Sequence, residues 1–140
     1  MIQVSYVHEL DYLRDSVTGD PFPGLWIVVR SLNDGRELEI QAHLDSGAER
    51  SLFDGQIARA IGLQAGNEER IYFRSTVGVD VVAVSHRVQL VHENLGEREL
   101  AVGFSDREIA RNLLGRDFFD LYQIGFREHS SKVLFSQEER

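Results

Sequence analysis

A strong β-hairpin signal constrains the fold of this chain more than any other feature. The run LWIVVRSL (residues 25–32) is rich in residues that favour strands, and Asn33-Asp34-Gly35 follows it. The returning segment ELEIQAHL (residues 37–44) alternates polar and apolar side chains. Two such runs joined by a turn of this kind predict an antiparallel hairpin. Its second strand ends at Asp45, so the hairpin carries one acidic side chain to a defined place.

The residues after this strand are compatible either with a catalytic site or with a simple turn that ends the strand. Asp45 is followed by Ser46, Gly47 and Ala48. Glycine lets backbone approach closely, and a carboxylate held at the end of a strand is typical of a catalytic group. Asp, Ser and Gly are also the commonest turn residues, so a strand-ending turn explains the tripeptide taken alone.

A second motif favours the catalytic interpretation. Residues 112–126 read NLLGRDFFDLYQIGF, and Gly115 in this segment lies 70 residues after Asp45. The pair, an apolar-Asp-Ser-Gly-Ala turn followed by an apolar-Gly-Arg-Asp segment, resembles the two signatures of the retroviral-type (retropepsin-like), single-lobed aspartic proteases. The resemblance covers roughly residues 22–135.

The resemblance implies a fold, an activity and a partner. The fold is a mostly β, closed-barrel-like acid-protease fold with one or two short helices. The activity is that of an aspartic endopeptidase on extended peptides, with Asp45 as the catalytic residue and no cofactor or metal. Such hydrolysis needs two carboxylates about 3 Å apart that share one proton. Because the chain has one such aspartate and a one-domain length of 140 residues, the second carboxylate must come from the other chain of a homodimer.

The resemblance also assigns roles to the residues around Asp45. Ser46 is expected to hydrogen-bond across the dimer axis. Gly47 is expected to give room to the backbone and to donate its N–H to the carboxylate, and Ala48 is expected to leave space for the peptide. Glu49 stands where the family binds substrate backbone.

The second motif and a flap supply the remaining expected site residues. Arg116 is expected to lie under the active-site turn and to pair with Glu49, either as a structural ion pair or as part of the site. Asp117 is expected to cap or brace the following helix. A strand pair over residues 69–90 occupies the place of the family's flap, and its tip candidates are Ser75, Thr76, Val77 and Gly78.

Periodicity predicts the other elements of a single domain spanning residues 1–140. Ile2, Val4 and Tyr6 alternate as a short strand, and a surface connection follows to residue 21. A one-sided helix is predicted over residues 51–63, ended by Gly62.

The C-terminal half is predicted in the same way. Strand residues recur up to Phe104 around a turn at residues 93–97. Residues 106–112 are polar and compatible with a helix, and a further helix is expected over residues 116–122. A last hairpin turns at residues 129–131, before a frayed tail at residues 136–140.

Composition excludes several classes of function. The formal net charge of −8 argues against nucleic-acid binding, which needs a basic surface. The chain has no cysteine, and its five histidines lack metal-ligand spacing. No apolar run approaches the roughly 20 residues that span a bilayer, and no signal-peptide pattern opens the chain. We therefore expect a cytoplasmic protein that does not bind membranes.

Two other interpretations stay open at the level of sequence. One is a catalytically inactive peptide-binding or dimerisation module on the same fold, because a fold does not guarantee an activity. The other is a purely structural dimeric adaptor. The dimer contacts are also open, since residues 1–7 and residues 132–136 are both candidates.

Overall fold

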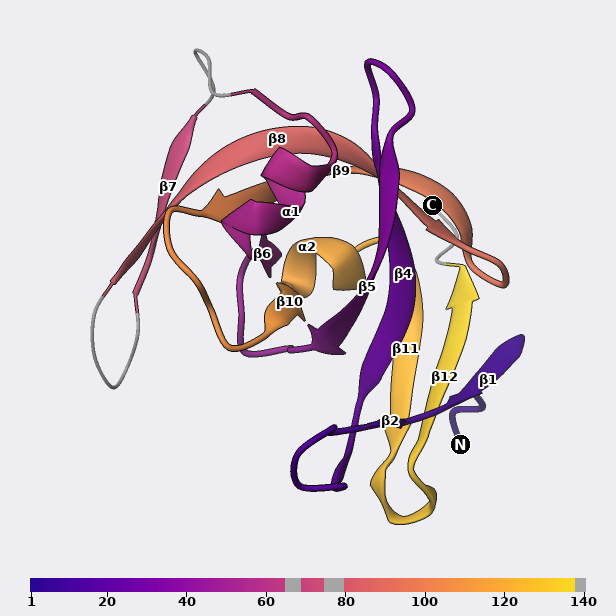
Figure 1. Ribbon diagram of the computed structural model, residues 1–140. Helices are drawn as coiled ribbons and strands as arrows, with labels where there is room; N and C mark the ends of the chain where they lie inside the picture. The colour runs from indigo at the N-terminus through magenta and orange to yellow at the C-terminus, as the bar shows by residue number, and fades with distance from the viewer. Residues whose placement is uncertain (65–68, 75–79, 138–140) are drawn as a thin grey trace.

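The computed structural model describes residues 1–64, 69–74 and 80–137. Six strands close into a barrel in the order β4, β5, β10, β6, β9, β8 and back to β4 (Figure 1). The predicted mostly β, closed-barrel architecture with two short helices is thus confirmed. The barrel strands are β4 (Gly24–Ser31), β5 (Glu37–Leu44), β6 (Leu52–Phe53), β8 (Val81–His92), β9 (Gly96–Ser105) and β10 (Asn112–Leu114).

The predicted hairpin forms the first two strands of the barrel. β4 and β5 pair antiparallel, with Ile27 opposite Ile40. Gly35 in the turn has φ +74°, a conformation that glycine adopts without strain. Leu25, Ile27 and Val29 of β4 are buried, as are Ile40, Ala42 and Leu44 of β5, so alternate side chains of each strand face the core.

The predicted strand pair before the long hairpin is also present. β7 (Arg70–Phe73) pairs antiparallel with the first part of β8, with Phe73 opposite Val81. β8 and β9 then form the longest ladder, joined by the predicted turn. The proposed flap tip, Ser75 to Gly78, lies outside the described residues.

The segment after Asp45 differs from the predicted helix. Leu52 and Phe53 form β6, which pairs in parallel with β9 and antiparallel with β10. Helix α1 covers only Gly55–Ala60 and begins after Asp54, whose side chain accepts the N–H of Gln56. The helical spacing was misleading because strand pairing with distant residues outweighs a weak local propensity. Gly62 does end the helix, with φ +76°.

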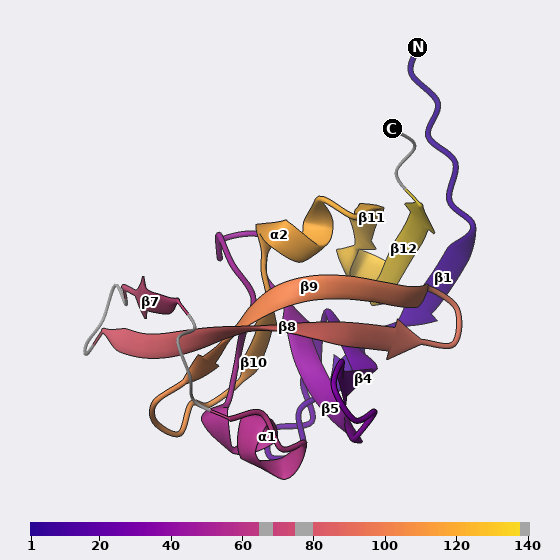
Figure 2. The ribbon, with the colours of Figure 1, turned by 90° about the horizontal axis from the view of Figure 1, so that it is seen from above.

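Residues 106–111 form neither helix nor strand, and Asn112 already belongs to β10. The Asn112 side chain accepts the N–H of Asp54 at 2.9 Å and donates to the carbonyl of Gln41 at 3.0 Å. These long-range hydrogen bonds compete with a local helix. Helix α2 (Arg116–Phe119) is shorter than predicted, since Tyr122 starts β11. Both helices lie beneath the arch of β8 and β9 in Figure 1, and the view from above in Figure 2 shows α1 and α2 well apart from each other.

A three-stranded sheet, in the order β1, β12, β11, lies at the opposite side of the barrel from β7 (Figures 1 and 2). The last hairpin turns through the short 3-10 helix η1 (Glu128–Ser130), close to the prediction. The remaining strands are β1 (His8–Asp11), β2 (Leu13–Arg14), β3 (Pro21–Phe22), β11 (Tyr122–Arg127) and β12 (Lys132–Gln137).

Both ends of the chain depart from the sequence prediction. The first strand begins at His8, not at Ile2, because Ile2 and Val4 are exposed and alternation without burial stabilises no strand. The expected connection up to residue 21 contains β1 and β2, with β3 starting at its last residue. The tail is ordered further than expected, since Ser136 and Gln137 belong to β12.

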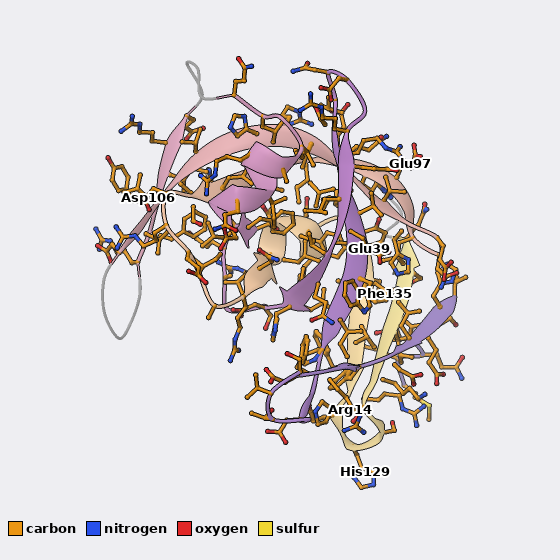
Figure 3. The ribbon with its side chains drawn as sticks, in the orientation of Figure 1. Arg14, Glu39, Glu97, Asp106, His129 and Phe135 are labelled. Carbon is orange, nitrogen blue, oxygen red and sulfur yellow. The ribbon has the colours of Figure 1, made fainter. Side chains whose placement is uncertain are left out.

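One apolar cluster joins the barrel to the terminal sheet. Leu25, Val29, Phe53 and Leu114 contribute from the barrel, and Phe135 contributes from β12. The Phe135 ring lies edge-on to Tyr122, with ring centroids 6.1 Å apart. Figure 3 shows Phe135 within the molecule, whereas His129 points away from it at the hairpin tip.

The substitution Phe135→Ala tests this packing. The side chain is fully buried, at 0% exposure, so its loss removes apolar contacts and leaves a cavity. We expect the free energy of unfolding to fall by about 3–5 kcal/mol in urea denaturation. Phe126→Ala in the same sheet is the control, because Phe126 is 42% exposed and its loss leaves no cavity. Equal losses in the two variants would contradict a core shared by barrel and sheet.

Candidate active site

Asp45 lies at the edge of a cleft of about 790 Å³. One wall is the segment from Asp45 to Leu52, and the opposite wall is β7 with the start of β8. The lining combines apolar side chains with two acidic and two basic ones. It consists of Asp45, Gly47, Ala48, Glu49, Arg50, Leu52, Ile71, Tyr72, Phe73, Arg74, Val81 and Leu113.

The barrel holds Asp45 by its backbone. β10 lies parallel to β5, with Leu114 opposite Leu44, and the Leu114 carbonyl accepts the N–H of Asp45 at 2.9 Å. This bond extends the β5–β10 ladder by one residue. The carboxylate therefore stands at the end of a paired strand, where its backbone position is well defined.

The turn after Asp45 organises the carboxylate. Oδ1 of Asp45 accepts the N–H of Gly47 at 2.9 Å, and the backbone carbonyl of Asp45 accepts the N–H of Ala48 at 3.2 Å. A Cβ on Gly47 would lie 3.2 Å from Oδ1, which is a tight contact. No hydrogen bond from the described residues reaches Oδ2 of Asp45 or the hydroxyl of the exposed Ser46. Both groups are therefore available to a ligand or a second chain.

The expected ion pair between Glu49 and Arg116 is present but is not the main support of the turn. A single contact of 3.5 Å joins Nη2 of Arg116 to Oε1 of Glu49, and their side chains are 59% and 84% exposed. An exposed pair without fork geometry contributes about 1 kcal/mol or less. The backbone of Arg116 does more, since its N–H donates to the Ala48 carbonyl at 2.8 Å.

The main support is a buried network between Ser51 and Asp117, and the sequence analysis did not assign Ser51 to the site. The Ser51 side chain is fully buried, and its hydroxyl donates to Oδ1 of Asp117 at 2.7 Å. The N–H of Ser51 donates to Oδ2 of Asp117 at 3.0 Å. The same hydroxyl accepts the N–H of Gly115 at 3.0 Å. Both sequence motifs are thereby joined through one carboxylate and one hydroxyl.

Asp117 also braces helix α2, as expected, although it lies inside the helix and Gly115 is the capping residue. Its Oδ1 accepts the N–H of Phe118 at 2.8 Å. An acidic residue in the first turn is favourable because free N–H groups point toward it.

Gly115 is required by close packing of the two motifs. A Cβ built there would lie 2.7 Å from the Ala48 carbonyl oxygen and 2.7 Å from the Arg50 carbonyl carbon. Both are backbone atoms, which cannot swing aside. The glycine of the second motif thus lets α2 pass directly against the Asp45–Leu52 segment.

The cleft residues outside the two motifs were missed by the sequence analysis. Arg50, Ile71 and Tyr72 line the cleft, together with Phe73 and Arg74. The only sequence signal for them was their place beside Asp45 or in the expected flap strands. Which of them face the cleft depends on strand pairing with β8.

A cluster of metal ligands and a membrane-spanning helix are two features that the described part of the chain lacks. No group of three His, Cys, Asp or Glu side chains among those residues could hold a metal ion. None of the described helices has the length and apolar character needed to cross a membrane.

His43, on β5 and two residues before Asp45, is the titratable group with a shifted pKa nearest to the candidate site. Its ring stacks on Phe22, with centroids 3.9 Å apart and an interplanar angle of 8°. Burial lowers the pKa of His43, and the positive charge of Arg111 lowers it further, while Asp15 and Asp45 act in the opposite direction.

Comparison with solved structures finds proteins with a similar fold. A retropepsin-like aspartic protease from Rickettsia conorii matches with a TM-score of 0.61 and 17% sequence identity, and the match covers 96% of each chain. EIAV protease complexed with the inhibitor HBY-793 matches with a TM-score of 0.54 and 18% identity, over 77% of this chain and 92% of that one. Neither a protein-family model nor a curated protein sequence matches the chain. The chain has the retropepsin-like fold that its two motifs predicted.

The substitution Asp117→Ala tests the network. It leaves the N–H and hydroxyl of the buried Ser51 without their acceptor. We expect a loss of about 3 kcal/mol in the free energy of unfolding, because unsatisfied buried donors are costly. Asp117→Asn keeps one acceptor oxygen, so we expect a smaller loss. The control Asp11→Ala removes an exposed carboxylate and should change stability little. A loss in Asp117→Ala no larger than in the control would show that the network does not hold the fold.

The lowered pKa of His43 predicts a pH dependence of stability. As pH falls below about 6.5, the unfolded chain takes up a proton on His43 more readily than the folded chain. Stability that is complete above this pH is therefore lost on acidification. We expect His43→Gln to show a smaller drop in Tm between pH 7.5 and pH 5 than the wild type does, whereas His129→Gln, at the exposed turn, should drop as the wild type does. If the drop in Tm is the same in His43→Gln as in the wild type, the lowered pKa of His43 is not the cause of the pH dependence.

Proposed function

We propose that this chain is an aspartic endopeptidase whose catalytic dyad consists of two Asp45 carboxylates, one from each chain of a homodimer. The observation that carries the proposal is the placement of Asp45. It stands at the end of β5 on the edge of the cleft, with one oxygen held by Gly47 and the other without a partner among the described residues. The retropepsin-like fold supports the same conclusion.

The chemistry follows from two carboxylates in close contact. Because both cannot be ionised at about 3 Å, they share one proton and titrate as a pair. The ionised member takes a proton from a water, which attacks the scissile carbonyl carbon. The protonated member donates its hydrogen bond to the carbonyl oxygen. The amine then leaves with a proton from the dyad, and the pair returns to its singly protonated state.

A single chain does not supply this pair in the cleft described here. The other acidic side chain of the lining is Glu49, and Arg116 lies against it at 3.5 Å. A second Asp45 must therefore come from a symmetry-related chain. The Ser46 hydroxyl, exposed and without a hydrogen bond to the described residues of its own chain, is free to bond across such an axis.

The proposed substrate is a peptide bound in an extended conformation. β7 is the last strand of its sheet, and its outer edge faces no other described strand. Because β7 also lines the cleft, a peptide can add to that edge through backbone hydrogen bonds. The apolar side chains of the lining, including Ile71, Phe73 and Leu113, then contact alternate substrate side chains.

Asp45→Asn tests the catalytic role. It removes the titratable proton while keeping the size and polarity of the side chain, so we expect the variant to remain folded and to lose peptide cleavage by at least about a thousandfold. Cleavage of a peptide library is followed by mass spectrometry, with circular dichroism to check folding. The wild type should show a bell-shaped pH profile on the acid side. Persistent cleavage by the variant would refute the role of Asp45.

A mixing experiment tests the second half of the dyad. Asp45→Asn protein is added to an equal amount of wild type and left to exchange subunits. If each dimer needs two aspartates, random pairing should reduce the activity to about half, because mixed dimers carry only one. Unchanged activity would place a complete site within one chain. An intact dimer that binds peptides and cuts none would instead favour the inactive binding module.

A further inference from the structure

Two arginines face the cleft from its opposite walls. Arg50 belongs to the segment that follows Asp45, and Arg74 comes directly after β7. Both side chains are exposed. Among the described residues, neither guanidinium forms an ion pair, whereas Arg30 and Arg87 on the outside of the barrel pair with glutamates.

Lack of a partner alone would not single out these two residues. Arg59 and Arg127 are also exposed, and neither has an ion pair to the described part of the chain. What distinguishes Arg50 and Arg74 is that they line one concave site in a chain whose net charge is −8. An acidic protein thus presents two cations to whatever occupies its cleft.

The two acids that line the same cleft, Asp45 and Glu49, form no ion pair with these arginines. Glu49 is engaged by Arg116, which is not part of the lining. The Asp45 carboxylate accepts a hydrogen bond from Gly47 and is the proposed catalytic group. Neither acid of the lining is therefore paired with Arg50 or Arg74, and both guanidinium groups are open to a carboxylate of the substrate.

The backbone at the base of Arg50 is held by close packing. Its carbonyl carbon lies 2.7 Å from the position that a Cβ on Gly115 would occupy. The next residue, Ser51, is held by both oxygens of Asp117. Arg74 extends from a paired strand, since Phe73 lies opposite Val81. Because the backbone at these two residues is already positioned, less conformational entropy is lost when their side chains bind a ligand.

We propose that Arg50 and Arg74 select peptides that carry an acidic side chain within the segment bound in the cleft, next to apolar residues that contact Ile71, Phe73 and Leu113. A guanidinium presents a planar fork of donors that matches a carboxylate, and such charge-assisted bonds strengthen when a bound peptide excludes water. This inference rests on the proposed function of the cleft, and it adds the class of substrate.

The first test compares matched peptides. A peptide cleaved by the wild type is made with acetylated and amidated ends, and Glu, Gln or Lys is placed in turn at each position around the scissile bond. We expect kcat/KM to be about tenfold higher for Glu than for Gln at one position or more, and lower still for Lys. The preference should weaken as salt is raised from 0.05 to 0.5 M.

Charge reversal tests which residues give the preference. In Arg50→Glu or Arg74→Glu, the ratio of kcat/KM for the Glu peptide to that for the Lys peptide should invert at the position that the residue contacts. A ratio is used because it does not depend on the amount of active enzyme. Arg127→Glu is the control, since it changes charge equally on β11, outside the cleft, and should keep the wild-type ratio and rate.

The outcomes separate this inference from the proposed function. If the wild type cleaves peptides but treats Glu and Gln alike at every position, the acidic preference is wrong and the endopeptidase stands. If it cleaves nothing, fluorescently labelled peptides with apolar residues around a central Glu, Gln or Lys are made, and their binding is measured by fluorescence anisotropy. If Glu peptides bind more tightly and this preference is lost in Arg50→Glu or Arg74→Glu, the arginines recognise an acidic side chain even without catalysis. Equal binding of all peptides would refute that recognition.

Discussion

The structure depends on the buried contact between Ser51 and Asp117, which fastens the Asp45 turn to helix α2. Two oxygens of one carboxylate and one hydroxyl satisfy three buried or partly buried donors at 2.7–3.0 Å. The contact is possible only because Gly115 has no side chain, so the two segments approach at backbone distance. Two residues 66 positions apart in the sequence are thereby joined directly. This contact positions the turn that carries Asp45, the backbone of Arg50 and the wall of the cleft that they form.

The same arrangement explains why one chain makes a fold but only half of the proposed site. The barrel closes and buries its core within a single chain, including Phe53, Leu114 and Phe135. The carboxylate proposed to be catalytic, that of Asp45, stays partly exposed in the cleft, and the other acid of the lining contacts Arg116. The barrel and its core are therefore complete within one chain, whereas the proposed chemistry requires a second copy.

Local patterns predicted what depends on neighbouring residues. The hairpin of β4 and β5, the pairing of β7 with β8 and the left-handed Gly62 all follow from alternation and turn residues close in sequence. Prediction failed where distant partners decide the outcome. Leu52 and Phe53 have helical spacing but pair with β9, and Tyr122 enters a strand because Gln137 lies opposite it. Ile2 and Val4 alternate as a strand would, yet they have no apolar surface to cover and remain exposed.

For the candidate site, the sequence alone determined the residue types and their order: one aspartate after a strand, a small turn, and a Gly-Arg-Asp segment that follows much later. Those features are chemical and local, so they can be read from the chain itself. Only the tertiary structure decided which contacts join them. It showed that the expected Arg116–Glu49 pair is exposed, assigned the holding role to Ser51, and brought Arg50 and Arg74 to one cleft. The physical reason is that hydrogen bonds and burial depend on distances between residues far apart in the chain, which spacing along the sequence does not contain.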